Sequence, residues 1–271
     1  MTRDRPDPAS HVPGGSVPSS EEGRRLLDLV KVMARLRGPG GCPWDREQTH
    51  ETLARHLLEE AHELLEAIDL GDADAIRDEL GDLLLQVVFH SQISSDGGRW
   101  DVDDVARRLV EKLVHRHPHV FGDVQVSGPD EVLTNWEQLK AEEAGGRSGV
   151  EDEIPATLPA LARAAKVQRR AAGWGVEWAS SEAAVAALRE EVAALSGASE
   201  AAEREIGEVL FATVAAARKL GVDAESALRR TTRGFAERYD RFLAIAEQRK
   251  LDLRSVPDDE IRELFREARD A

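Results

Sequence analysis

The sequence has 271 residues, of which 41% are hydrophobic and only 4% aromatic, and it carries a formal net charge of −16 at pH 7. This excess of acidic residues argues against sequence-independent binding to nucleic acid, because that binding depends on a basic surface. The one cysteine, Cys42, excludes an internal disulfide and a cysteine-based zinc site, and it fits a reducing compartment. No apolar run approaches the roughly twenty residues of a membrane span, so we expect a cytoplasmic protein without a membrane anchor.

The composition predicts an all-α fold. Alanine, leucine, glutamate and arginine are abundant, and the alternating β-branched runs that are typical of strands are missing. Residues 1–20 are rich in proline, glycine and serine and cannot bury enough apolar surface to offset the entropy of ordering, so we expect a disordered tail. From about residue 21 an apolar stripe predicts a helix, which ends at the glycine-rich segment 38–41.

The segment 41–50 that follows is neither periodic nor low in complexity, and it reads as a loop. Its Trp44 and Asp45 are candidates to contact a planar ligand such as a nucleobase, since an exposed indole ring stacks on flat aromatic systems. A tryptophan in this place could instead plug the end of a helical core, which is where large aromatic side chains are usually found. From this segment alone we favour the core interpretation and keep contact with a base as the alternative.

Two groups of carboxylates lie on the next two predicted helices, which are joined by a polar turn at 70–74. The first group reads Glu59-Glu60-x-x-Glu63 and the second Glu79-x-x-Asp82. Positions three apart share a helix face, so antiparallel packing would bring four carboxylates together. An all-oxygen ligand set suits Mg²⁺, with Mn²⁺ as a substitute. Acidic strings are also common on solvated helices, but here the second group opens a run that is apolar nearly all round, as in a buried helix.

The following helix, expected over residues 102–114, carries candidate anion-binding residues. Lys112 and Arg116 are four residues apart, so both cations can reach toward one anion such as a phosphate. The alternating histidines at 115–119 invite a metal interpretation, but alternate residues do not share a helix face and Pro118 interrupts the run. We interpret them as a solvated helix end with a histidine or two near substrate.

The chain then divides. A short helix around Trp136 is followed by the glycine-rich segment 145–149 and an acidic stretch, which together predict a boundary. We expect an N-terminal domain at 21–144, a linker at 145–155 and a C-terminal helical domain at 156–271.

The C-terminal half contains a damaged copy of the acidic motif. The segment 205–211 parallels 79–85, and the segment 190–194 parallels 59–63. Ala194 stands where the first copy has Glu63, and Gly234 falls opposite Lys112. Because each missing carboxylate removes a potential metal ligand, we expect the active centre in the N-terminal domain, with the second domain structural, regulatory or weakly active.

These motifs resemble the MazG nucleoside triphosphate pyrophosphohydrolases, in the long bacterial form with two tandem domains. The resemblance extends from about residue 22 to the C-terminus, and it rests on the acidic groups and on the strings GCPWDREQTHETL, ELGDLLLQVVFHSQ, KLVHRHPHVFGDV and NWEQLK. It implies tandem all-α domains with antiparallel helices that form a dimeric bundle. It also implies Mg²⁺-dependent hydrolysis of a (deoxy)nucleoside triphosphate, damaged or non-standard nucleotides included, to the monophosphate and pyrophosphate.

The resemblance also implies residue roles. It makes Glu60, Glu63, Glu79 and Asp82 the metal ligands and Glu59 the residue that orients or deprotonates the attacking water. In long members of the family the C-terminal domain carries most of the activity, and this sequence departs from that pattern. The residues also allow a nucleotide-sensing regulatory protein with little hydrolysis. A di-iron carboxylate bundle is disfavoured, because its Glu-x-x-His pairs lie too close together here to occupy two separate helices.

Overall fold

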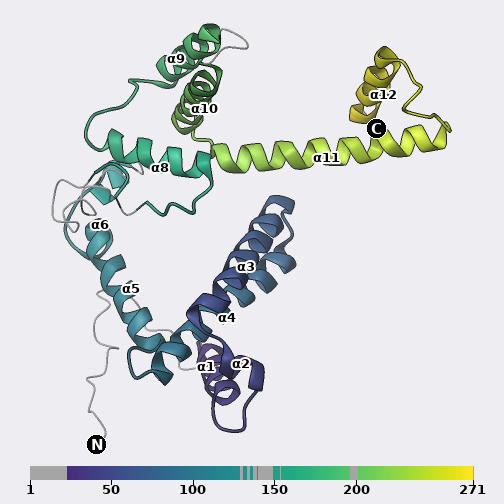
Figure 1. Ribbon diagram of the computed structural model, residues 1–271. Helices are drawn as coiled ribbons and strands as arrows, with labels where there is room; N and C mark the ends of the chain where they lie inside the picture. Colours follow the sequence, from purple (N-terminus) through teal and green to yellow (C-terminus); the bar gives the residue numbers. More distant parts are fainter. Residues whose placement is uncertain are drawn as a thin grey trace, which may run out of the picture. The chain divides into compact units, whose positions relative to one another are not determined.

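The computed structural model describes residues 23–128, 131–132, 135–136, 139, 149–152, 154–195 and 201–270. Every regular element within these ranges is a helix, which confirms the all-α prediction. The chain divides into two compact units, Met1–Trp136 and Glu137–Ala271, each described below by itself (Figure 1). The predicted tail and part of the predicted linker lie outside the described residues.

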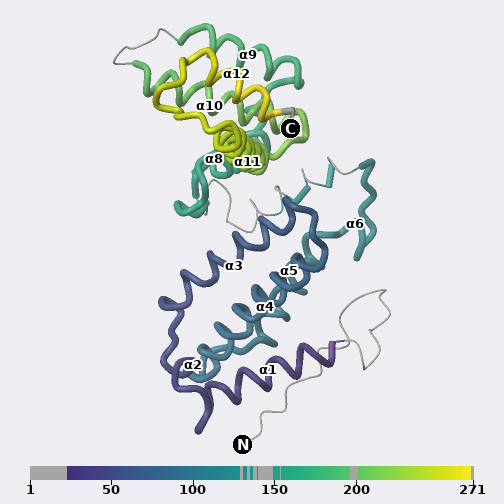
Figure 2. The backbone as a smooth tube through the Cα atoms, turned by 90° about the vertical axis from the view of Figure 1, so that its right-hand side faces the viewer, coloured from purple at the N-terminus to yellow at the C-terminus, as the bar shows by residue number. Residues whose placement is uncertain are grey.

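The N-terminal unit is organised around a helical hairpin. Its helices are α1 (Arg24–Arg37), α2 (Pro43–Glu47), α3 (His50–Leu70), α4 (Ala73–Asp96), α5 (Val102–Arg116) and α6 (Pro118–Phe121). Helices α3 and α4 run antiparallel and lie side by side in both views (Figure 1, Figure 2). Helix α1 packs on α4, whereas α5 leaves the hairpin at an angle after contacting α4. The expectation of a loop at 41–50 was wrong over Pro43–Glu47, where a proline at the first helical positions favours a short helix.

The turn of the hairpin is encoded locally. Gly71 ends α3 with φ 71°, a left-handed conformation that favours glycine. Asp72 then caps α4, because its carboxylate accepts hydrogen bonds from the backbone N–H groups of Asp74 and Ala75 at 3.0 and 3.1 Å. At the other end, Thr49 caps α3 through a reciprocal pair of hydrogen bonds with Thr52. These caps fix where the two carboxylate-bearing helices begin.

The core of this unit lies at the open end of the hairpin, away from the Gly71 turn, between α1, α3 and α4. It contains Met33, Leu53, Val88 and Phe89, each at most 3% exposed. Farther along the same helices, several large apolar side chains remain exposed, among them Leu58 at 60% and Leu80 at 51%. Stable monomers rarely expose large contiguous apolar faces, and the described residues of this unit do not cover these side chains.

The C-terminal unit repeats the order of packing seen in the first. Its helices are α8 (Ala160–Ala172), α9 (Ser181–Ala194), α10 (Ala202–Lys219), α11 (Ala224–Gln248) and α12 (Asp258–Asp270). Helices α9 and α10 pair as α3 and α4 do, and α8 packs on α10 as α1 packs on α4. Helix α12 folds back on the far end of α11 around Phe242, Leu264 and Ala268 (Figure 1). None of the described helices combines the length and the apolar character needed to cross a bilayer.

Candidate metal and nucleotide site

Three of the predicted ligands meet on the α3–α4 hairpin. Glu60, Glu79 and Asp82 each offer a carboxylate oxygen, and these oxygens all lie within 4.8 Å of one another. Burial raises the pKa of Glu60 above its ordinary value, and the neighbouring charges of Asp82 and Glu63 raise it further. The pKa of Glu79 is raised for the same two reasons. The cluster is therefore a focus of negative charge, and within the described residues the net effect of burial and neighbouring charges is to raise both pKa values.

Glu63, the fourth predicted ligand, borders this cluster without joining it. Its side chain is exposed, and its charge contributes to the raised pKa values of both Glu60 and Glu79. Among the described residues only Glu60, Glu79 and Asp82 meet the distance criterion for a three-residue metal site. Glu63 lies one turn beyond Glu60 on the same face of α3, so rotation about its flexible side-chain bonds can move its carboxylate toward the cluster.

The separation of the three oxygens fits a hard divalent cation. Oxygen ligands at about 2.1 Å from Mg²⁺ in an octahedron lie about 3 to 4 Å from one another. The three carboxylates need only small side-chain adjustments to reach that spacing, and the donor set contains neither sulfur nor nitrogen. The chemistry of the site thus suits Mg²⁺ or Mn²⁺.

The predicted phosphate-binding cations do not lie at this cluster. Lys112 and Arg116 are near the C-terminal end of α5, which diverges from the α3–α4 hairpin within the unit (Figure 1). The guanidinium of Arg116 lies over the Trp136 ring, 5.4 Å from its centroid. Within one copy of the chain, the carboxylates and the cations are therefore on different arms of the fold.

Trp44 lies on the short helix α2, next to the core residue Phe89. It is 52% exposed, so it does not plug the core, and its ring meets Phe89 and His56 edge-on at 6.4 and 6.3 Å between centroids. The Nδ1 atom of His56 lies 3.0 Å from Oε2 of Glu59, the predicted base. The aromatic side chain and the acidic residue are thus connected through one histidine, which the sequence analysis missed although His56 and Glu59 have the i, i+3 spacing of a helical pair.

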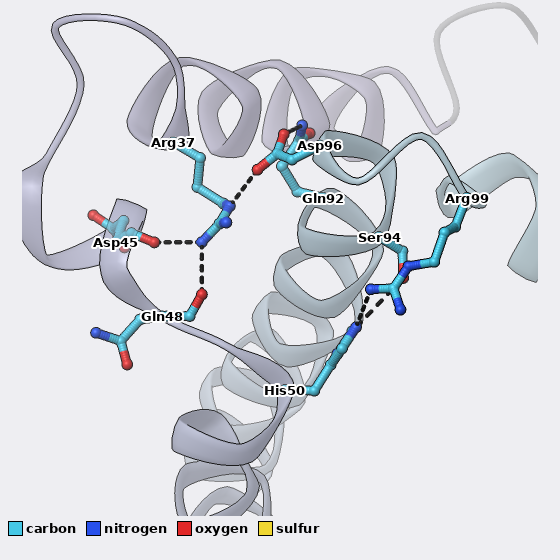
Figure 3. Close-up of polar contacts among 8 residues, drawn as sticks. All are labelled: Arg37, Asp45, Gln48, His50, Gln92, Ser94, Asp96 and Arg99. Atoms are coloured by element: carbon cyan, nitrogen blue, oxygen red, sulfur yellow. Dashed lines mark hydrogen bonds and ion pairs between the residues drawn. The ribbon is translucent and has the colours of Figure 1, made fainter.

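Arg37 holds the segment that carries Trp44 and Asp45. Its side chain is only 8% exposed, and its Nε atom donates to Asp96 Oδ2 at 2.7 Å (Figure 3). Its Nη1 atom donates to the backbone carbonyls of Asp45 at 2.5 Å and Gln48 at 3.2 Å. One guanidinium therefore ties α1, α2 and the end of α4 together. Nothing in the local sequence marks Arg37 out from the exposed Arg35, so sequence reasoning could not find it.

A second polar cluster lies beside this anchor, around His50. Arg99 Nη2 lies 3.2 Å from His50 Nε2, and because arginine only donates hydrogen bonds, Nε2 must accept (Figure 3). His50 is then neutral with its hydrogen on Nδ1, which donates to Nδ1 of His90 at 2.8 Å. Burial lowers the pKa of His90, and the neighbouring His50 ring lowers it further, so the structure favours the neutral form of His90.

The C-terminal unit has a different set of charges at the matching positions. Arg204 Nη1 lies 2.7 and 2.8 Å from the two carboxylate oxygens of Glu208. Arg238, four residues after Gly234 as Arg116 follows Lys112, donates from Nε to the Phe265 carbonyl at 2.7 Å and lies over the Phe265 ring. Within the described part of this unit no three acidic or histidine side chains approach one another as Glu60, Glu79 and Asp82 do.

An all-α chain with a carboxylate cluster on a helical hairpin is compatible with a hydrolase that acts on nucleotides, and sequence comparison identifies the family. The family model of the MazG nucleotide pyrophosphohydrolase domain matches residues 48–121, which include α3, α4 and α5. The chain belongs to the MazG family of nucleoside triphosphate pyrophosphohydrolases. The match lies in the N-terminal unit, which contains the carboxylate cluster.

Several curated relatives extend the similarity over both units. A Thermotoga maritima nucleoside triphosphate pyrophosphohydrolase/pyrophosphatase MazG is 42% identical over 92% of this chain and 97% of its own length. The nucleoside triphosphate pyrophosphohydrolase of Escherichia coli K12 is 40% identical over 89% of this chain and 95% of its own. A Mycobacterium tuberculosis nucleoside triphosphate pyrophosphohydrolase is 47% identical over 58% of this chain and 47% of its own.

Proposed function

We propose that the N-terminal unit hydrolyses a (deoxy)nucleoside triphosphate between its α and β phosphates, with Mg²⁺ or Mn²⁺, to give the monophosphate and pyrophosphate. The observation that carries this proposal is the convergence of Glu60, Glu79 and Asp82 from both arms of the hairpin. Family membership supports the reaction class. Damaged or non-standard nucleotides are proposed among the substrates, in keeping with a role in sanitation of the nucleotide pool.

Each predicted residue has a role in this reaction. Glu60, Glu79 and Asp82, with Glu63 after a side-chain rotation, would hold the cation, which when bound neutralises phosphate charge and lowers the pKa of water. Glu59, positioned by His56, would orient or deprotonate the attacking water. Lys112 and Arg116 would stabilise the charge on the phosphates. The exposed face of Trp44 would stack on the base, with Asp45 beside it.

We also propose that the protein acts as a homodimer whose two copies share each site. The carboxylates and the cations lie on different arms of one copy, and a catalytic site for a triphosphate needs both. The arms carry exposed apolar side chains suited to burial against a second copy, namely Leu57, Leu58, Leu80, Leu84, Leu109, Val110 and Leu113. In this arrangement α5 of one copy would approach the hairpin of the other.

Pyrophosphate release from a panel of ordinary and modified dNTPs tests the function. Glu63→Ala should lower turnover at least about 100-fold with the fold intact, the scale expected when a preorganised charged group is lost. Glu205→Ala, which removes the counterpart of Glu79 in the C-terminal unit, should leave turnover near normal. Loss in the Glu205 variant alone would move the active centre to the other unit. No release from the wild type would favour the nucleotide-sensing alternative.

Mixing two inactive variants tests the shared site. If copies exchange at random, half of the dimers contain one Glu63→Ala copy and one Arg116→Ala copy, and one of the two sites in each such dimer is intact. The mixture should therefore recover about one quarter of wild-type activity. Recovery of none, with exchange verified by a tag on one variant, would show that each site belongs to a single copy.

A further inference from the structure

The C-terminal unit contains a pocket that the hydrolytic reaction does not use. It has a volume of about 280 Å³ and lies between α9 and α10, next to the segment that precedes α9. Two aromatic side chains, Trp178 and Phe211, line it, and Gly207 leaves part of its wall without a side chain. The volume is just below the range of about 300 to 1,000 Å³ that is usual for small-molecule sites. The pocket can therefore enclose a flat ring system, and any larger substituent would lie at its open side.

The charges of the pocket argue against a metal-bound triphosphate. Arg204 already neutralises Glu208, since one of its nitrogens lies within 2.8 Å of both carboxylate oxygens. Ala194 supplies no ligand where the first unit has Glu63. The C-terminal unit has Gly234 at the position of Lys112, so that phosphate-binding cation is missing. Arg238, at the position of Arg116, already donates a hydrogen bond to the Phe265 carbonyl.

What remains is a pocket with two aromatic side chains in its wall and one available carboxylate. Glu191 lines the pocket, is half-buried, and has no ion-pair partner in the part of the unit that the structure describes. Its two oxygens only accept hydrogen bonds when ionised, so a ligand with two neighbouring N–H donors satisfies both. Aromatic walls favour a flat ring system, because stacking on an aromatic side chain is available to any nucleobase.

We propose that this pocket is a metal-independent binding site for a purine nucleoside whose base carries neighbouring N–H donors, as guanosine does. The base would lie against Trp178 and Phe211 and donate its hydrogens to Glu191, with the sugar at the open side. Adenosine presents a single exocyclic amine on that edge and leaves one carboxylate oxygen unsatisfied. The C-terminal unit would then bind a nucleoside while the N-terminal unit carries the chemistry.

Isothermal titration of the full-length protein with guanosine, adenosine and GTP in excess EDTA tests the proposal. We expect guanosine to bind without metal, more tightly than adenosine or GTP. Phe211→Ala should weaken guanosine binding about tenfold, whereas Leu210→Ala, at an adjacent exposed position that does not line the pocket, should not. Glu191→Gln should remove most of the preference for guanosine over adenosine, and Glu190→Gln should preserve it.

The outcomes separate this site from the hydrolytic one. Absence of guanosine binding in EDTA would overturn the proposal, as would equal weakening by Phe211→Ala and Leu210→Ala. Loss of binding in Glu60→Gln, with Phe211→Ala unaffected, would locate the ligand in the N-terminal unit and also overturn it. Circular dichroism of each variant verifies folding. Pyrophosphate release by Phe211→Ala should stay at the wild-type rate, so failure of one proposal leaves the other testable.

Discussion

Replacing Arg37 with methionine should destabilise the N-terminal unit far more than its position on the surface of a helix suggests. Methionine keeps the packing volume over Phe89 but removes the donors to the carbonyls of Asp45 and Gln48. Hydrogen bonds from a charged donor contribute about 1.5 to 3 kcal/mol each, and water can reach the freed carbonyls, so we take about 3 kcal/mol for the pair. The ion pair with Asp96, whose side chain is 39% exposed, adds less than about 1 kcal/mol.

A loss of about 3 kcal/mol in a unit of this size lowers Tm by roughly 10 °C or more. Thermal unfolding followed by circular dichroism measures it, with Arg35→Met as the matched control. Arg35 is exposed on the same helix and donates a single hydrogen bond, to the Pro39 carbonyl at 2.8 Å. A Tm for Arg37→Met within about 2 °C of that for Arg35→Met would refute the assignment of Arg37 as the anchor of α2.

Three further predictions concern the hairpin and its surroundings. Mg²⁺ at 100 times its Kd should increase the free energy of unfolding of the wild type by about 2.7 kcal/mol, as measured by calorimetry. Glu79→Gln should lose this stabilisation by Mg²⁺, and Glu205→Gln should keep it. Because burial lowers the pKa of His90, the unfolded chain takes up a proton more readily than the folded chain, so the free energy of unfolding should fall as pH drops below about 6.5. Urea unfolding should find that dependence weaker in His90→Gln. Asp72→Ala should cost about 1 kcal/mol through loss of the α4 cap, with the exposed Asp74→Ala near neutral in the same assay.

The hairpin and its acidic cluster could be predicted from sequence because the determining signals are local. The spacing of Glu79 and Asp82 fixes a shared helix face, and Gly71 followed by Asp72 specifies the end of one helix and the start of the next. The separation of Lys112 from the carboxylates could not be predicted. It depends on the angle at which α5 leaves the hairpin, and that angle is set by tertiary packing rather than by helical periodicity.

The anchoring residues escaped prediction for a related reason. Arg37 donates its hydrogen bonds to the backbone carbonyls of Asp45 and Gln48. Every residue has such a carbonyl, so the amino-acid types at these positions do not reveal the contact. His56 has a readable spacing to Glu59, but its contact with Trp44 appears only once α2 has folded against α3 and α4. Residue identity thus predicted which groups carry charge, and packing decided which of them meet.

Both units place carboxylates near one another on a pair of helices, and the two units differ in what offsets the repulsion between them. In the N-terminal unit, carboxylates crowd together, and the raised pKa values of Glu60 and Glu79 record that the fold disfavours their charged forms. Such a cluster is stabilised when a divalent cation neutralises it. In the C-terminal unit Arg204 neutralises Glu208 directly, and Ala194 removes a further charge. A helix pair whose carboxylates are already paired gains little stability from a bound metal. The C-terminal unit has Arg204 and Ala194 where the N-terminal unit has Asp78 and Glu63, so its folding would not depend on metal, and its pocket would stay accessible to another ligand.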